Sequence, residues 1–192
     1  ERDQALKLNN HLVAAELSFL TDKEHALRAA ERIERLKSLR RISPGSPEVA
    51  WALARAYGRA GLTRESLKSA RAAVASAAGP EEIVRLTAFY QERDRAAEAQ
   101  QTLASALRAA PNDETLLQEQ VRLKEEGDQT AIPSYQRLLQ VKPSGVMVRL
   151  RLAELYQAAG NPKAAVQALQ VARRQRPQDA HVCALLADAL QE

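Results

Sequence analysis

Cysteine and aromatic residues are scarce in this sequence. The single cysteine, Cys183, cannot form an internal disulfide bond, which leaves both the cytoplasm and a disulfide-free periplasmic protein open. Aromatic side chains make up 4% of the 192 residues, and alanine and leucine carry most of the apolar share. This balance favours close-packed helices over β-sheets. No apolar run approaches the roughly 18 residues of a membrane helix, and no signal-peptide pattern opens the sequence, so we expect no membrane insertion.

Residues that could perform catalysis are also few and scattered. The three histidines are far apart, and only His181 has a thiol near it. His181 and Cys183 are two residues apart, a spacing that points side chains to different faces of a helix. No serine or cysteine is paired with a histidine, and no glycine-rich phosphate loop follows a strand. We therefore expect a protein that is not an enzyme, with no metal, no cofactor and no small-molecule substrate.

The charged residues are numerous but mixed. Lys and Arg exceed Asp and Glu by four, while 45% of the residues are hydrophobic, so the chain should fold. The strongest basic cluster comprises Arg32, Arg35, Lys37, Arg40 and Arg41. Glu31 and Glu34 interrupt it, and no aromatic residue is interleaved for base stacking. A nucleic-acid-binding helical repeat is therefore an alternative that the sequence disfavours.

Prolines and short breakers divide the sequence into a periodic series. Pro143 follows Pro111 by 32 residues and Pro177 follows Pro143 by 34 residues, each after an alanine-rich amphipathic segment. Gly61 and Gly160 stand where a helix should end in a left-handed residue, and other prolines stand at first turns. About eleven helices are predicted, and their short connections make sequential helices antiparallel neighbours.

These segments resemble the tetratricopeptide repeat (TPR) family, whose signature is W-x₂-L-G-x₂-Y, then A-x₃-F, then P. The best copy begins at Val146 and departs only at the opening aromatic place, which Arg149 fills. Its matching residues are Leu152, Ala153, Tyr156, Gly160, Ala165, Leu169, Ala172 and Pro177. The resemblance implies an all-α, right-handed superhelical α-solenoid of antiparallel helix pairs.

Other copies match less completely. The copy from Pro80 has Asp94 in place of the turn glycine, and the next repeat has Glu119 and Gln120 where leucine and a small residue belong. We expect an atypical helical hairpin over 1–45 and a TPR array over 46–192. The expected repeats cover 47–79, 80–112, 113–145, 146–179 and a truncated 180–192. The last helix has no expected partner and the first residue is not methionine, so we expect a fragment of a larger bacterial TPR protein.

The resemblance also implies a partner-binding groove, because the first helix of each TPR hairpin lines a concave surface. The residues at its non-signature places are Glu48, Trp51, Arg55, Arg59, Val84, Gln91, Glu92, Leu117, Lys124, Met147, Leu150, Glu154 and Gln157. Trp51, Arg55 and Arg59 have i, i+4, i+8 spacing and form one stripe, which could hold an aromatic or acidic element of a peptide. The alternative is that Trp51 packs on the neighbouring hairpin and the arginines are solvated.

The resemblance implies a non-catalytic scaffold that docks a protein or peptide partner. The clamp of Lys, Asn and Arg with which some TPR proteins capture acidic C-termini is absent, because its places hold Trp51, Arg55 and Val84. The Ala-, Arg- and Gln-rich composition is similar to bacterial TPR regions of envelope, secretion or exopolysaccharide-export assemblies, which favours the periplasm over the cytoplasm. Homo-oligomerisation through an uncapped end of the array, near Leu186 and Leu190, is the alternative.

Overall fold

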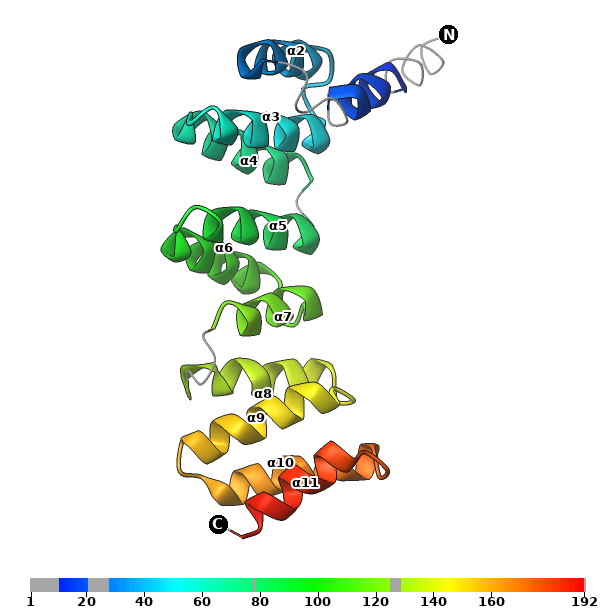
Figure 1. Ribbon diagram of the computed structural model, residues 1–192, viewed down its shortest axis with the longest axis vertical. Coiled ribbons are helices and arrows are strands. Elements are labelled where there is room, and N and C mark those ends of the chain that lie inside the picture. The colour runs from blue at the N-terminus through cyan, green and yellow to red at the C-terminus, as the bar shows by residue number, and fades with distance from the viewer. Residues whose placement is uncertain (1–10, 21–27, 78, 125–128, 192) are drawn as a thin grey trace. The chain divides into compact units, whose positions relative to one another are not determined.

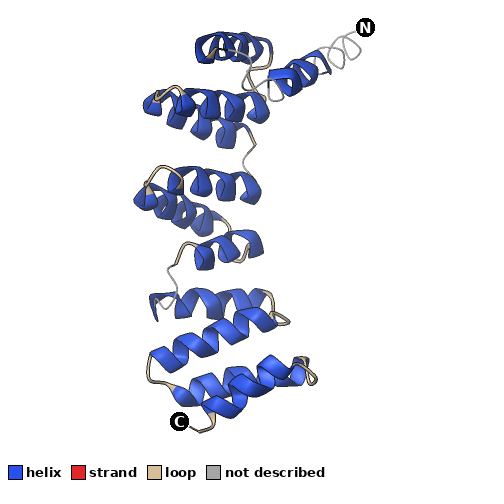
Figure 2. Cartoon of the chain, in the orientation of Figure 1, coloured by secondary structure: helices blue, strands red, loops and turns tan. Residues whose placement is uncertain are grey.

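The computed structural model describes residues 11–20, 28–77, 79–124 and 129–191. Within these ranges it contains eleven α-helical segments, one short 3₁₀ turn and no strand (Figures 1 and 2). Within each of the two units named below, consecutive helices pack against each other as antiparallel pairs. The all-α class and the paired helices that the sequence predicts are therefore confirmed. The contacts divide the chain into two compact units, Glu1–Arg93 and Asp94–Glu192, and each is described by itself.

Unit 1 contains the helical residues 11–20 and four further helices. These are α2 (Ala29–Ile42), α3 (Pro47–Arg59), α4 (Thr63–Ser76) and α5 (Pro80–Gln91). Helix α3 is central, because it packs against α2 and α4 and its side chains reach both the helix of residues 11–20 and α5. We call residues 11–20, α3 and α5 the first-helix layer of unit 1.

Unit 2 contains six α-helices and a 3₁₀ turn, η1 (Gln129–Ala131). The helices are α6 (Ala96–Ala109), α7 (Glu114–Arg122), α8 (Ile132–Val141), α9 (Val146–Ala158), α10 (Pro162–Gln175) and α11 (Ala180–Ala189). The repeat with Glu119 and Gln120 at signature places has short helices. Helix α7 has nine residues and α8 has ten, the same number as α11. The expected turn residue of this repeat, Gly127, lies outside the described residues.

The helix ends follow from identifiable residues. Pro47, Pro80 and Pro162 occupy first turns of helices. A backbone N–H in the first turn has no acceptor within the helix, so proline breaks no helical hydrogen bond there. Gly61 and Gly160 have φ values of 73° and 67°, the left-handed conformation that glycine adopts without steric cost. The sequence predicted all five of these positions.

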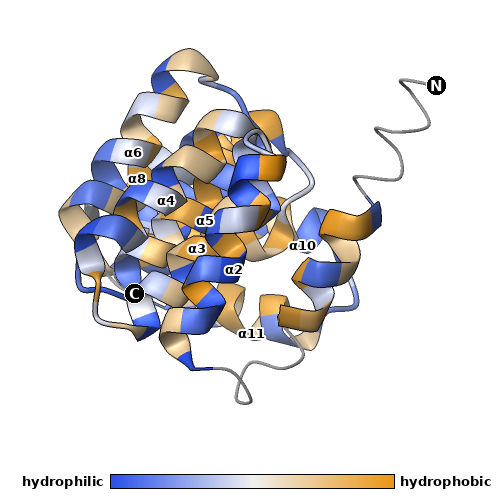
Figure 3. Cartoon of the chain, turned by 90° about the horizontal axis from the view of Figure 1, so that it is seen from above, coloured by the Kyte–Doolittle hydropathy of each residue, from blue (hydrophilic) through white to orange (hydrophobic). Residues whose placement is uncertain are grey.

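Each unit has an aliphatic core. In unit 1 the buried apolar residues of 11–20, α2 and α3 form one cluster, and Trp51, which is not part of this cluster, joins α3 to α5 through a ring contact with Phe89. In unit 2 the main cluster joins α9, α10 and α11 and consists of Val, Leu and Ala. Polar and apolar residues alternate along the helical ribbons, as Figure 3 shows, so each helix buries one face and exposes another.

Candidate partner-binding site

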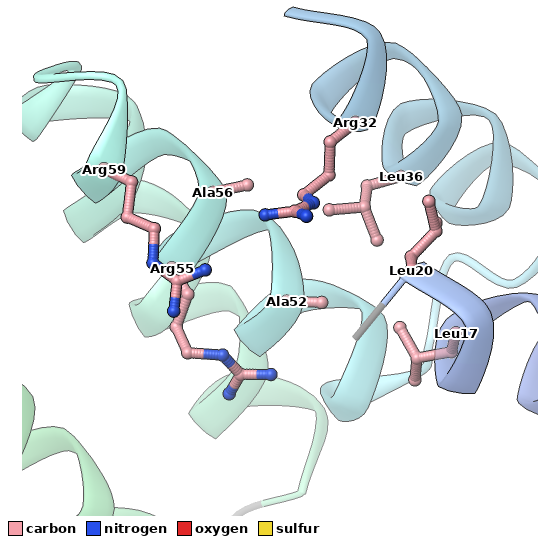
Figure 4. Close-up of a pocket in the computed structure, with 8 residues that line it drawn as sticks. All are labelled: Leu17, Leu20, Arg32, Leu36, Ala52, Arg55, Ala56 and Arg59. Atoms are coloured by element: carbon pink, nitrogen blue, oxygen red, sulfur yellow. The ribbon is translucent and has the colours of Figure 1, made fainter. Parts of the chain in front are cut away.

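The candidate site is a cavity in unit 1 of about 130 Å³. The helix of residues 11–20, α2 and α3 surround it (Figure 4). Two small residues of α3, Ala52 and Ala56, are one helical turn apart and leave the space open. The described residues that line it are Leu17, Leu20, Arg32, Leu36, Ala52, Arg55, Ala56 and Arg59. The cavity therefore combines an apolar floor with a cationic rim.

Three arginines supply the charge of this rim. Arg32 extends from α2 toward α3, while Arg55 and Arg59 lie along α3 (Figure 4). Arg32 is buried, with 7% of its surface exposed, whereas Arg55 and Arg59 are exposed. No acidic residue is among the described residues of the lining. A guanidinium group presents several N–H donors in a planar fork, so this rim is suited to carboxylate or phosphate oxygens.

Arg55 also experiences a second positive charge from α5. The pKa of Arg55 is lowered, first because partial burial removes water from its guanidinium group and second because Arg85 repels its charge. Among the described residues no carboxylate forms an ion pair with Arg55. The neighbouring Arg85 is itself paired with Glu82 at 3.6 Å.

Trp51 lies in the core rather than on the surface. Only 1% of its surface is exposed. Its ring meets Phe89 edge-on, with the centroids 5.6 Å apart, and the Arg85 guanidinium lies 4.6 Å from the indole centroid. Its Nε1 donates a hydrogen bond to Glu82 Oε2 at 2.5 Å. Of the two alternatives for Trp51, the structure agrees with packing on the neighbouring hairpin, because three side chains of α5 enclose the indole.

The other predicted groove residues of unit 1 remain at or near the surface. Glu48 is exposed and accepts a hydrogen bond from the Ser46 hydroxyl at 2.7 Å. Glu92 is exposed and pairs with Arg93 at 3.2 Å. Val84 and Gln91 are half-buried. None of these four lines the cavity at Arg55, so their place in a binding surface stays a prediction.

The predicted residues of unit 2 divide into core and surface groups. Leu117 and Leu150 are 0% and 3% exposed, so they pack inside the unit and are unavailable to a partner. Met147 is 67% exposed. Glu154 accepts a hydrogen bond from Arg151 at 2.5 Å, and Gln157 is half-buried. These residues belong to a different unit from Arg55 and are not joined with it in one site.

Lys124 lines a separate cavity of unit 2. This cavity measures about 160 Å³ and lies between α6 and the end of α7. Lys124 Nζ donates a hydrogen bond to Thr130 Oγ1 at 3.0 Å. The remaining described lining residues are Gln100, Leu103, Ala104, Gln120 and Leu123, none of which is charged. This site lacks the concentration of charge found in unit 1.

Sequence reasoning missed Arg32, which lines the cavity, and Arg85, whose charge acts on Arg55 although Arg85 is not among the described lining residues. Arg85 is on the first-helix layer, one residue after the predicted Val84, and Arg32 was assigned to the basic cluster of the preceding helix. A signal for Arg85 existed, because Glu82, Arg85 and Phe89 have the i, i+3, i+7 spacing of one helix face. No comparable signal identifies Arg32, which extends from α2 toward α3 (Figure 4).

The basic cluster of α2 is divided by the fold. Arg32 enters the cavity at Arg55, whereas Lys37, Arg40 and Arg41 line a larger cavity of about 660 Å³ between α2, α3 and α4. Glu34 and Glu65 also line this second cavity. Lys37 donates a hydrogen bond to Glu34 at 2.7 Å, which raises the pKa of Lys37. The cluster therefore does not form one continuous basic stripe.

None of the described helices has both the length and the apolar character that crossing a membrane requires. Comparison with curated proteins finds no match to this sequence. Comparison with protein families finds the tetratricopeptide repeat over residues 129–189. This range runs from η1 through α11 and includes the copy that best resembles the signature.

Solved TPR structures resemble the fold over nearly the whole chain. MamA is 16% identical, with 90% of this chain and 94% of that one covered and a TM-score of 0.60. A tetratricopeptide repeat protein from Parabacteroides merdae is 18% identical, with 96% and 73% covered and a TM-score of 0.58. YrrB, described as a TPR protein with an unusual peptide-binding site, is 13% identical, with 92% and 89% covered and a TM-score of 0.54. Residues 129–189 thus match the tetratricopeptide repeat, and the solved structures show that the chain has the fold of TPR proteins.

Proposed function

We propose that this chain is a non-catalytic scaffold that binds a protein or peptide partner on the first-helix layer of unit 1. TPR arrays are in general non-catalytic repeat scaffolds for protein interaction, since stacked helix pairs present an extended surface. The observation that carries the proposal is the cavity at Ala52 and Ala56, which has an apolar floor and a rim with Arg55 and Arg59.

The surroundings of the cavity support binding rather than catalysis. Its described lining has no carboxylate, histidine, serine or cysteine that could act as a base or nucleophile. Arginine is enriched at protein interfaces, where it provides both charge and apolar contact area. YrrB has the same fold and is described as having a peptide-binding site, which is consistent with a peptide ligand here.

The setting is a further part of the proposal. The alanine-, arginine- and glutamine-rich composition favours a bacterial envelope, secretion or exopolysaccharide-export assembly. Co-purification of the full-length protein from its own cells, with membrane and soluble fractions analysed separately, tests this setting. Recovery only with cytoplasmic partners would contradict it.

The binding face is tested by substituting its arginines. Arg55→Ala with Arg59→Ala should reduce recovery of the native partner, because both side chains are exposed on the proposed face. Arg64→Ala with Arg174→Ala is the matched control, since both residues are exposed and lie on α4 and α10. Equal recovery of the partner with both double variants would show that the binding face lies elsewhere.

Self-association is a second candidate, favoured by one observation. Leu190 is 63% exposed directly after α11, and Leu186 is only half-buried. Light scattering over a range of protein concentrations measures the oligomeric state. A dimer that Leu190→Glu converts to a monomer would support self-association, whereas a monomer at every concentration would remove this candidate.

A further inference from the structure

The cavity of about 660 Å³ in unit 1 is a groove on a different face of α3 from the cavity at Ala52 and Ala56. The two cavities have no described lining residue in common. Ala50, Leu53 and Tyr57 of α3 have the spacing of one helix face and form the floor of the groove. Charged residues of α2 and α4 form its two walls. We call this cavity the α2–α4 groove.

One end of the α2–α4 groove is basic. Arg40 and Arg41 line it from the last turn of α2, and Arg40 donates a hydrogen bond to the Ser46 carbonyl, just before α3, at 2.8 Å. Arg41 is exposed and donates a hydrogen bond to the Ser38 hydroxyl at 3.0 Å. Lys68 is exposed on the wall formed by α4. Within the described part of the chain, none of these three cations is in an ion pair with a carboxylate.

The other end of the α2–α4 groove carries acidic residues. Helix α4 follows α3 after a short turn, so its first residues lie beside the last residues of α3. Glu65 therefore lies at the Tyr57 end of the groove, where it is exposed and forms no ion pair with a described residue. Glu34 also lines the groove, but its charge is matched by Lys37 at 2.7 Å. The groove thus presents unmatched positive charge at one end and an unmatched carboxylate at the other.

The length of the α2–α4 groove sets the spacing of a ligand's charges. The stripe on α3 from Ala50 to Tyr57 covers two helical turns and rises about 10 Å. Three residues of an extended chain rise by about the same distance. Between the ends the floor is apolar, because Leu53 lies there beside the half-buried Tyr57. A linear chain therefore matches the groove when an apolar side chain separates opposite charges.

We propose that the α2–α4 groove binds a linear peptide segment of a partner protein, with acidic residues and a basic residue about three residues apart around an apolar side chain. The peptide carboxylates contact Arg41 and Lys68, since charged hydrogen bonds of this kind are the strongest that side chains make. The basic side chain contacts Glu65, and the apolar side chain covers Leu53 and Tyr57. This site is separate from the docking face proposed on the first-helix layer and goes beyond it.

The lining favours a peptide over a nucleic acid. A nucleic-acid strand carries a phosphate at every nucleotide, so it would bring negative charge to Glu34 and Glu65 as well as to the arginines. Single strands are also held by aromatic side chains on which successive bases stack. Tyr57 is the one aromatic residue among the described lining. A peptide avoids both difficulties, because its charges differ in sign from residue to residue.

The experiment uses the capped peptide Gly-Asp-Glu-Leu-Ala-Lys-Gly carrying fluorescein, with the full 192-residue chain. Fluorescence anisotropy measures the Kd. We expect saturable binding that weakens by at least about tenfold for Arg41→Glu with Lys68→Glu, because both substitutions place like charges beside the peptide carboxylates. Arg64→Glu with Arg174→Glu changes the net charge equally outside the described lining and should leave the Kd within about twofold. Equal weakening in this control, or no saturable binding, would overturn the inference.

Charge reversal in both molecules separates direct contact from loss of folding. The peptide Gly-Lys-Lys-Leu-Ala-Glu-Gly carries the opposite charge at each charged position. The natural chain should prefer the original peptide, and the triple variant Arg41→Glu, Lys68→Glu and Glu65→Lys should prefer the reversed one. Circular dichroism checks that the variant is folded. A folded triple variant that keeps the original preference would contradict the assigned contacts.

Two further peptides test the basic and apolar positions. Acetylation of the peptide lysine should weaken binding to the natural chain several-fold but should not affect binding to Glu65→Gln, in which the contact is already absent. Replacing leucine by glycine should also weaken binding several-fold, because less apolar surface is covered. An equal effect of acetylation on both proteins would remove Glu65 from the site, and no effect of glycine would remove the floor.

Other occupants of the α2–α4 groove give different results. Tighter binding of a single-stranded RNA with the peptide's net charge would replace the peptide by a nucleic acid. A dimer in light scattering that Arg41→Glu with Lys68→Glu converts to a monomer would assign the groove to a second copy of the chain. Arg55→Ala with Arg59→Ala should leave the Kd of the peptide unchanged, and loss of peptide binding in that variant would place the peptide on the first-helix layer instead.

Discussion

Both units contain ion pairs on their helices, but Arg55 of unit 1 stands apart from them. Arg122 pairs with Glu119 at 2.6 Å in unit 2, and Arg35 pairs with Glu31 at 3.0 Å in unit 1. In unit 1 Arg55 lies beside Arg85 and has no ion pair with a described carboxylate. The match to the family covers only residues of unit 2. Arg55 thus differs from the paired residues of both units, and it lies outside the range that matches the family.

The units also differ in how their first helices pack. In unit 1 the large ring of Trp51 joins α3 to α5, with Glu82, Arg85 and Phe89 around it. In unit 2 aliphatic residues such as Leu150 and Leu169 join α9 to α10 and α11. An aromatic anchor concentrates the packing energy in one side chain, whereas an aliphatic core distributes it. The substitutions below test this difference.

Trp51→Ala should have the largest effect on stability. Removing a fully buried tryptophan leaves a cavity between α3 and α5, and we expect a loss of about 3–5 kcal/mol in the free energy of unfolding. Urea unfolding followed by circular dichroism measures this loss. Trp51→Phe is the control, because it keeps a ring against Phe89 and loses mainly the hydrogen bond to Glu82, at about 1 kcal/mol. A loss below 1 kcal/mol for Trp51→Ala would show that the indole is not an anchor.

Leu150→Ala tests the core of unit 2 at a position that the sequence assigned to the groove. Leu150 is 3% exposed, so its truncation should cost about 2–5 kcal/mol. Met147→Ala, on the same helix and 67% exposed, should change stability by less than about 0.5 kcal/mol. Helicity reports the whole chain, while emission of Trp51 reports unit 1. We expect the midpoint by helicity to move more than the midpoint by emission, and equal shifts would mean that the units unfold together.

Arg122→Ala should have a smaller effect, of about 1–3 kcal/mol. The carboxylate of Glu119 has only 2% of its surface exposed and accepts hydrogen bonds from Arg122 Nε and a terminal guanidinium nitrogen at 2.6 and 2.7 Å. Removing the arginine deprives a buried carboxylate of two charged hydrogen bonds. Glu119→Leu restores the residue type of the TPR signature and should be neutral or stabilising. Thermal unfolding of both variants compares them, and equal destabilisation would show that the pair is needed as a pair.

The sequence predicts the helix boundaries well because these depend on local chemistry. A proline at a first turn or a glycine after the last turn acts through its own backbone, whatever lies next to it. Asp94 illustrates this, since it stands at the turn-glycine place of its repeat and has a positive φ of 56°. Aspartate is among the few residues other than glycine that tolerate this conformation.

The binding surface is less predictable because it depends on neighbours. Helical spacing places Trp51 and Arg55 on one stripe, but the stripe is covered wherever the next helix carries large side chains. Phe89 and Arg85 cover Trp51, whereas the small side chains of Ala52 and Ala56 leave an opening on the other side of α3. Leu117 and Leu150 were assigned to the groove from their places in the TPR hairpin, and they are buried by their neighbours. The exposure of these side chains depends on packing between helices. The residue spacing along one helix does not show which of its faces a neighbouring helix will cover.

The turns provide the smallest test of the difference between units. Gly61 in unit 1 has a φ of 73°, and no atom lies within 4 Å of the position that a Cβ would take. Gly61→Ala should therefore lower the free energy of unfolding by about 1–2 kcal/mol, the cost of the left-handed conformation for alanine. The lower entropy of the unfolded chain with alanine offsets part of this loss. Asp94→Gly removes a similar backbone strain but adds flexibility to the unfolded chain, so its net change should stay below about 0.5 kcal/mol. Urea midpoints of the two variants measure the difference; a loss above 1 kcal/mol for Asp94→Gly would mean that the aspartate side chain, and not only its backbone, stabilises the turn.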